Sequence, residues 1–255
     1  MAPGHTVHVY PSRQELAHAA ACVFVERSRE AIGLRGRFAV ALAGGSTPRE
    51  LYRLLGDDDA FRGAVSWPDV QVFWGDERHV PPTHDDSNFR AAREALLDRV
   101  PIPRHQVHRI EAESPDAERA ALAYEATIRA VFGLAVGAWP SFDLVLLGMG
   151  QDGHTASLFP GSATVHERAR LVAAPLIETF ASHRITLTPP VFAHARAIAV
   201  LVAGAEKART LQEVLEGPLV PDRYPVQCLR ESIGTVTWLV DAAAAWLLTP
   251  GAHPA

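Results

Sequence analysis

The sequence predicts an α/β fold in which helices cover both faces of a mostly parallel sheet. Short apolar runs typical of buried strands alternate with helical patterns along the chain. Such alternation favours parallel strands joined by crossover helices. Three of the apolar runs end in glycine-bearing loops, and ligands of parallel sheets bind at the carboxyl ends of the strands. We therefore expect these three loops to meet in one site.

Each predicted element follows from a local pattern. Gln14–Ile32 is the first long helical pattern, and Ser12 precedes it as an N-cap, a position where serine is favoured. The predicted helices are Gln14–Ile32, Arg49–Leu55, the segment from its N-cap Ser87 to Leu97, Pro115–Phe132 and Glu206–Leu215. The predicted strands are the segment that begins with His8–Tyr10, then Phe38–Ala43, Val70–Trp74, Phe142–Leu147, Leu171–Ile177, His183–Leu187, Ala197–Val202 and Thr235–Val240.

Composition, charge and cysteine content narrow the class of protein. Apolar residues make up 48% of the 255 residues, and we find neither repeats nor a linker, so we expect one domain over residues 1–255. The formal net charge of −5 argues against nucleic acid as the main partner. The two cysteines, Cys22 and Cys228, lie far apart in the sequence and form no disulfide pattern, which fits a reducing compartment. Cys22 is expected to be a buried thiol. Without a signal-like N-terminus or an apolar run of about 20 residues, we expect a cytoplasmic protein with no membrane partner.

The first glycine-bearing loop is Gly44-Gly45-Ser46-Thr47-Pro48, between a predicted strand and a predicted helix. Its glycines let the backbone turn tightly and approach a ligand closely. Ser46 or Thr47 is expected to cap the following helix, and Pro48 suits a first turn. Exposed amides at a helix N-terminus, together with two hydroxyls, could bind an anion, although a plain and well-capped turn explains the same residues.

The second loop, from Trp74 through Asp76 and Glu77 to Arg78, follows the next predicted strand. A carboxylate pair beside an arginine at the end of a strand could orient water and bind phosphate. A solvated charged turn is the alternative interpretation, because most runs of charged residues are of that kind. The loop alone leaves both interpretations open.

The third loop, from Gly148 to Ser157, contains a G-x-G-x-x-G pattern that invites a dinucleotide interpretation. Pro160 and Gly161 interrupt the helix that such a motif should open, and Glu178 is only loosely spaced as a ribose-binding acid. His154 gives the better hypothesis, because imidazole titrates near working pH and suits general-base catalysis. A structural histidine is the commoner case, but this one stands at a strand terminus, two residues after an aspartate.

Two further cations stand out. Arg184 lies in a predicted strand, and Lys207 follows an apolar strand at the start of a predicted helix. A cation is unfavourable at a helix N-terminus unless an anion compensates it. That conflict indicates a phosphate near Lys207, with a solvated lysine as the alternative.

Other kinds of site find no support in the sequence. The chain lacks H-E-x-x-H and paired Cys-x-x-Cys motifs, and His79, His84 and Asp85 lack ligand spacing in their proline-rich loop, so we expect no metal. A G-x-S-x-G elbow is absent, which argues against a serine hydrolase. The first loop also lacks the Gly-Lys-Ser/Thr ending of a Walker loop.

Taken together, the loops resemble those of the 6-phosphogluconolactonase family. The matching segments are Ala43–Pro48, Trp74–Arg78, Ser87-Asn88, Leu147–Ser157, Arg184–Thr188 and Gly204–Lys207. They occur in the family's order, and the resemblance as a whole extends from about residue 7 to residue 247. The set is specific, although each segment alone is not. The resemblance implies a Rossmann-like fold, which the family shares with glucosamine-6-phosphate deaminases.

The resemblance also implies roles for individual residues. His154 would be the catalytic base, Asp152 would orient its imidazole or shape the turn, and Asp76 and Arg78 would belong to the active site. The substrate's phosphate would lie among Gly44, Gly45, Ser46, Thr47, Arg184 and Lys207. No cofactor is implied.

The implied reaction is hydrolysis of 6-phospho-D-glucono-1,5-lactone to 6-phospho-D-gluconate, in the oxidative pentose phosphate pathway. His154 would take a proton from water as the water attacks the lactone carbonyl. The alternatives are an enzyme like glucosamine-6-phosphate deaminase and a non-catalytic sugar-phosphate sensor. Deaminases that resemble this chain carry a glutamate five residues after the histidine, where this chain has Phe159. The sugar phosphate lactone is the expected partner, and the protein is expected to be a monomer or a weak homo-oligomer.

Overall fold

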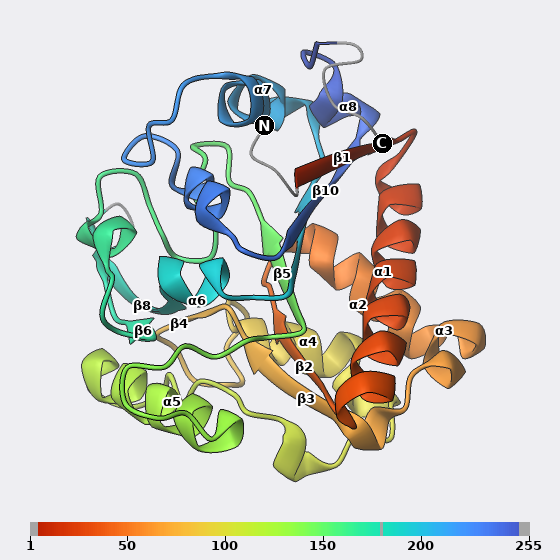
Figure 1. Cartoon of the computed structure of the whole chain (residues 1–255), viewed down its shortest axis with the longest axis vertical. Coiled ribbons are helices and arrows are strands. Elements are labelled where there is room, and N and C mark those ends of the chain that lie inside the picture. The colour runs from red at the N-terminus through yellow and green to blue at the C-terminus, as the bar shows by residue number, and fades with distance from the viewer. Residues whose placement is uncertain (1–4, 179–180, 250–255) are drawn as a thin grey trace.

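Six parallel strands form the central sheet of the computed structural model, which describes residues 5–178 and 181–249 (Figure 1). The strands lie in the order β1-β10-β9-β5-β2-β3. Their bounds are β1 His5–Tyr10, β2 Phe38–Leu42, β3 Val70–Trp74, β5 Leu144–Gly148, β9 Ala197–Val202 and β10 Thr235–Asp241. Every residue of β2 and β9 is buried, as in a parallel sheet that is covered on both faces. The predicted α/β fold is confirmed.

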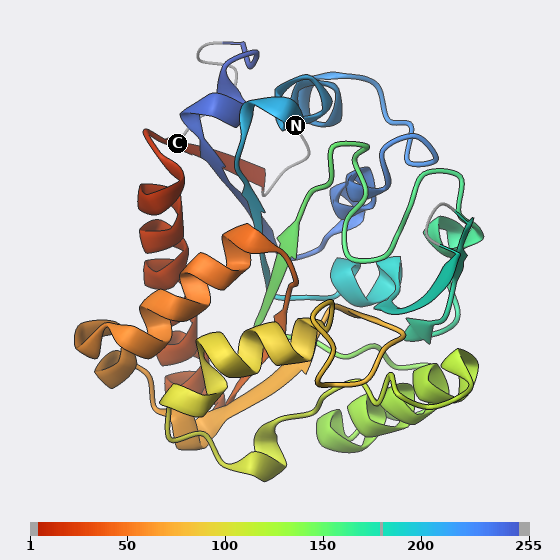
Figure 2. The same ribbon diagram turned by 180° about the vertical axis from the view of Figure 1, so that it is seen from behind.

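Helices lie on both sides of this sheet. Helices α1 and α2 cover one face, and α5 and α6 lie on the other side with a small second sheet (Figures 1 and 2). The α-helices are α1 Arg13–Arg35, α2 Ser46–Asp57, α3 Asp59–Ala64, α4 Asn88–Ala95, α5 Ala117–Phe132, α6 Pro189–Ala193, α7 Ala208–Glu216 and α8 Ala242–Ala245. Short 3-10 helices are η1 Trp67–Asp69, η2 Leu97–Arg99, η3 Arg104–Gln106, η4 Ala163–His166, η6 Ala205–Lys207 and η7 Pro225–Glu231.

The second sheet is small and antiparallel, and the sequence did not indicate it. Its strands are β4 Asp76–Arg78, β6 Val172–Ala173, β7 Leu176–Ile177 and β8 Ser182–Leu187. The predicted strand over 171–177 is therefore two short strands, and Pro175, which has no N–H to donate, lies between them. Both strands, and the predicted strand over 183–187, pair outside the parallel sheet.

Two helix starts agree with the sequence and one does not. Ser12 caps α1 by accepting from the N–H of Glu15, and Ser87 caps α4 by accepting from the N–H of Arg90. Capping of α2 by Ser46 or Thr47 was wrong, because Gly45 is the N-cap and both hydroxyl residues already belong to the helix. Gly45 has φ +104°, which only glycine adopts readily, and this lets the chain enter the helix earlier.

Cys22 was expected in the core, but it is exposed. The buried side of α1 includes Ala20, Ala21 and Phe24, and position 22 points to solvent between them. Cys228 is buried, and burial raises the pKa of its thiol to about 12.

The described part of the chain holds no helix both long and apolar enough to cross a membrane. Residues 1–4, on which the prediction about the N-terminus partly rests, lie outside the described residues.

Candidate active site

The loops that follow β2, β3 and β5 open into one cavity of about 240 Å³. These strands are neighbours in the order β5-β2-β3, so their carboxyl ends lie side by side and bring distant loops together. Most of the predicted site residues line this cavity: Gly44, Gly45, Ser46, Thr47, Asp76, Arg78, His154 and Lys207. Asp152 and Arg184 do not line it, but each lies next to a residue that does.

The N-terminus of α2 forms one wall of the cavity. Gly44 and Gly45 lead into it, and Ser46 and Thr47 are its first two residues. The N-cap Gly45 has no side chain to accept hydrogen bonds from the first turn of α2. The backbone N–H groups of that turn are therefore available to an anion in the cavity. Asn88 packs so closely against Gly44 that a β-carbon there would lie 2.0 Å from its Oδ1 atom.

His154 is held in place by its own loop. The Oδ1 atom of Asp152 lies 2.6 Å from Nδ1 of His154 and accepts from its backbone N–H at 3.1 Å. Burial raises the pKa of Asp152, but the hydrogen bonds and charge of His154 outweigh burial and hold that pKa below its ordinary value. An ionised Asp152 can only accept a hydrogen bond, so Nδ1 of His154 carries the proton and Nε2 is left as the basic nitrogen.

The imidazole is also confined by two other residues of its loop. The ring of Phe159 stacks on His154 with the centroids 4.4 Å apart and an interplanar angle of 27°. At Gly150, an added β-carbon would lie 2.1 Å from Nδ1 of His154 and 2.2 Å from its Cε1. The imidazole therefore fits only because residue 150 has no side chain. Side-chain packing and one hydrogen bond together fix the orientation of the ring.

Asp76 begins β4 and is buried at the edge of the cavity. Its Oδ2 atom accepts from the hydroxyl of Ser157 at 2.7 Å. Its Oδ1 atom accepts from Nδ2 of Asn88 at the longer distance of 3.3 Å. The carboxylate is thus held from the histidine loop and from the first residue of α4.

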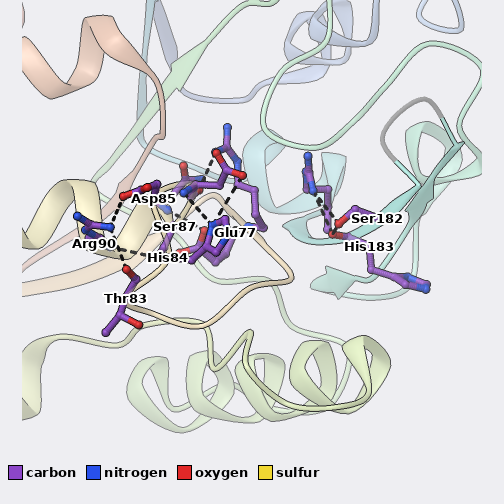
Figure 3. Close-up of polar contacts among 12 residues, drawn as sticks. Glu77, Thr83, His84, Asp85, Ser87, Arg90, Ser182 and His183 are labelled. Carbon is purple, nitrogen blue, oxygen red and sulfur yellow. Dashed lines mark hydrogen bonds and ion pairs between the residues drawn. The ribbon is translucent and has the colours of Figure 1, made fainter.

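Glu77 does not line the cavity, although the sequence suggested that it could form a carboxylate pair with Asp76. Its Oε1 atom accepts from the N–H groups of Arg78 at 2.8 Å and Asn88 at 2.7 Å. Its Oε2 atom accepts from the Ser87 hydroxyl at 3.0 Å and the Phe89 N–H at 2.8 Å (Figure 3). Burial raises the pKa of Glu77 and the accepted hydrogen bonds oppose that rise. Glu77 is a structural acid at the start of α4.

The segment between β4 and α4 is tied to both elements. Nη1 of Arg78 donates to the carbonyl of Asp86 at 2.7 Å. Arg90 on α4 donates to the carbonyl of Thr83 at 2.9 Å and pairs with Asp85 (Figure 3). These contacts tie Arg78, at the end of β4, to the segment that leads into α4.

Arg184 lies on β8 directly opposite Arg78 on β4. Burial, and then the charge of Arg78, lower the pKa of Arg184, while Asp76 opposes them. Its Nη1 atom donates to the Ser182 hydroxyl at 3.2 Å and to the His183 carbonyl at 3.3 Å (Figure 3). Like charges on paired strands repel, so an anion between Arg78 and Arg184 would stabilise both.

Lys207 lies at the start of α7 and lines the cavity from the end of β9. Burial lowers its pKa, Glu206 and Asp241 oppose that shift, and Arg13 adds to it. An anion in the cavity would favour the charged form of Lys207.

Sequence reasoning missed three residues around the site. Asn88 and Ser157 were matched as parts of motifs without a role, and the stacking of Phe159 was not foreseen. Their side chains act on residues far away in the sequence or across a turn, which a local pattern does not reveal. Within residues 5–178 and 181–249, no group of three or more His, Cys, Asp or Glu side chains is arranged to hold a metal ion.

Comparison with known proteins gives a consistent result. Residues 11–238 match the family model described as glucosamine-6-phosphate isomerases/6-phosphogluconolactonase. The 6-phosphogluconolactonase of Synechocystis is 39% identical over 98% of this chain and 100% of its own length. The human 6-phosphogluconolactonase is 38% identical over 97% of this chain and 95% of its own length.

Solved structures agree. The 6-phosphogluconolactonase from Trypanosoma cruzi has a TM-score of 0.85 and 32% identity, with 98% of each chain covered. A monomeric glucosamine-6-phosphate deaminase has a TM-score of 0.80 but 20% identity, so it shares the fold. The chain therefore belongs to the family of glucosamine-6-phosphate isomerases and 6-phosphogluconolactonases.

Proposed function

We propose that this protein hydrolyses 6-phospho-D-glucono-1,5-lactone to 6-phospho-D-gluconate, with His154 as the general base and without a metal or cofactor. One observation carries the proposal. His154 lines the cavity while the Asp152 carboxylate holds its Nδ1 atom at 2.6 Å. A histidine held in this way presents one basic nitrogen in a fixed direction. The names of the relatives at 36–39% identity support the same reaction.

The cavity suits a phosphorylated substrate. Lys207, Arg78 and the first turn of α2 all line it and can all bind an anion. Arg184, the partner of Arg78 in the β4–β8 pair, adds a further positive charge next to this wall of the cavity. Binding of the phosphate would fix the lactone relative to His154 and so offset the entropy of orienting it.

The proposed chemistry needs one proton acceptor. His154 takes a proton from water as the water oxygen bonds to the lactone carbonyl carbon. Negative charge develops on the carbonyl oxygen, where Arg78 or backbone amides of the cavity stabilise it. The imidazolium, stabilised by Asp152, then gives its proton to the ring oxygen as the C–O bond breaks. The product is a carboxylic acid that ionises in water, and His154 is again neutral.

The deaminase alternative is less well supported. Phe159 occupies the position of the glutamate in deaminases that resemble this chain, and its ring stacks on His154. A hydrocarbon ring cannot transfer a proton. The sensor alternative keeps the anion site and predicts binding without turnover.

The test is a direct assay with freshly prepared lactone, beside unphosphorylated gluconolactone. Turnover should exceed spontaneous hydrolysis and should prefer the phosphorylated lactone. His154→Ala should lose at least about 10²-fold in kcat and still bind 6-phosphogluconate. His166→Ala is a matched control, because His166 pairs with Asp222 at 2.5 Å and does not line the cavity.

Each outcome is decisive. Turnover at the spontaneous rate, with 6-phosphogluconate bound, would favour the sensor. Strong turnover that survives in His154→Ala would remove His154 as the base and make Asp76 the first candidate. A cytoplasmic location and a monomeric or weakly associating state are proposed with the function, and size-exclusion chromatography tests the latter.

A further inference from the structure

A buried hydrogen bond joins two of the three loops at the cavity. Ser157 comes three residues after His154, and the residue is 1% exposed. Its hydroxyl donates to Oδ2 of Asp76 at 2.7 Å, across 81 positions of sequence. A hydrogen bond from a neutral donor to a buried carboxylate is of the strong kind, because the acceptor is charged.

Ser157 is itself anchored on the strand that pairs with Asp76. The backbone N–H of Ser157 donates to Oγ1 of Thr186 on β8 at 3.3 Å. Thr186 is the partner of Asp76 in the antiparallel β4–β8 pair. One residue of the histidine loop therefore contacts both members of a single cross-strand pair.

The backbone before Ser157 is shaped for this contact. Ala156 has φ +46°, a conformation that residues with a β-carbon rarely adopt. It lines the cavity, and the next residue turns into the protein interior. Strained backbone that persists at a ligand site is retained by the contacts around it.

We propose that Ser157 is a positioning residue, which sets the place of the Asp76 carboxylate relative to the His154 imidazole. The inference rests on the proposed lactonase function. Oδ2 of Asp76 accepts the short bond from Ser157, while Oδ1 accepts only the longer one from Asn88 and is the less strongly held oxygen. A carboxylate oxygen accepts two hydrogen bonds, so Oδ1 can also accept from a substrate hydroxyl or from the attacking water.

The experiment is a double-mutant cycle on lactone hydrolysis. Ser157→Ala should lower kcat/KM by about tenfold, the effect of one hydrogen bond to a charged group. In an Asp76→Asn background the same substitution should lower kcat/KM by less than about twofold, because residues that act through each other are not additive. Ser157→Thr, which keeps the hydroxyl, should retain most of the wild-type kcat/KM.

Controls separate positioning from general loosening of the fold. Ser28→Ala removes an equally buried hydroxyl in α1, which donates to the Val25 carbonyl at 2.8 Å, and should leave kcat/KM unchanged. Thermal unfolding of both alanine variants is measured in parallel. Should Ser157→Ala unfold, Ser157→Cys replaces it, since a thiol of similar size is a weak donor.

The outcomes are distinct. Additive losses in the cycle, or wild-type kinetics in Ser157→Ala, would overturn the positioning role and leave the lactonase proposal intact. A wild-type protein that does not accelerate hydrolysis of the lactone would overturn the proposed function, and the positioning role with it. A loss that occurs when Asp76 is present but not in Asp76→Asn, and that is absent from Ser157→Thr, supports the inference.

Discussion

Gly150→Ala tests whether the fixed imidazole matters for catalysis. A β-carbon at residue 150 would lie 2.1 Å from Nδ1 of His154 and 2.7 Å from Oδ1 of Asp152. An ordinary contact is about 3.5–4.0 Å, so the imidazole must move by more than about 1 Å. That displacement breaks the 2.6 Å contact between His154 and Asp152. Since a misplacement of about 1 Å can cost about 10²-fold, we expect kcat to fall about 10²-fold with the fold intact.

The assay compares Gly150→Ala with two other variants. Gly63→Ala is the matched control, because a β-carbon at Gly63 would meet no atom within 4 Å and the residue lies in α3, away from the cavity. Its kcat should equal that of the wild type. In a His154→Ala background, Gly150→Ala should cause little further loss, because the displaced group is then already absent.

Two results would refute this reasoning. If Gly150→Ala keeps more than half of the wild-type kcat, then either the imidazole tolerates the shift or His154 is not the base. If Gly150→Ala loses activity equally in the presence and absence of His154, the substitution acts by another route, such as blocking the cavity. A melting temperature near that of the wild type is required for either reading.

Further predictions concern stability, pH and specificity. Glu77→Gln should lower the free energy of unfolding in urea by at least about 2 kcal/mol. Each oxygen of Glu77 accepts from two donors, so the amide nitrogen of glutamine would face two donors in either orientation. An unfolding midpoint at the wild-type urea concentration would contradict this. Since burial lowers the pKa of Lys207, its charge should be lost at a lower pH than in an ordinary lysine, so calorimetric affinity for 6-phosphogluconate should weaken there on the alkaline side. The weakening should be absent in Lys207→Arg, and its persistence would assign it to another group. Pure protein should release no ammonia from glucosamine 6-phosphate, and steady release would restore the deaminase alternative.

The parallel sheet could be predicted because its signals are local. Apolar runs over β2, β3, β5 and β9 and the caps Ser12 and Ser87 need only neighbouring residues to be recognised. The small sheet could not be predicted, because β6 and β7 have two residues each and their pairing with β8 is set by tertiary contacts. The cap of α2 was misassigned because the conformation of Gly45 at φ +104° competes with serine capping.

Most of the candidate site could be located from the sequence for the same reason. Each loop follows a recognisable strand, and parallel strands carry their loops to one edge. The contacts that individual side chains of these loops make could not be predicted. The stacking of Phe159 on His154 and the bond from Ser157 to Asp76 depend on backbone turns, including the positive φ of Ala156.

The contrast between Asp76 and Glu77 shows how one dipeptide supplies two different acids. Neighbouring residues of a strand point to opposite sides, so Asp76 faces the cavity while Glu77 faces the start of α4. Both oxygens of Glu77 already accept two hydrogen bonds, and such an oxygen has no lone pair left for a ligand. Oδ1 of Asp76 has one long contact and keeps that capacity. The alternation of the strand, rather than the acidic sequence itself, therefore decides which carboxylate can act on a substrate.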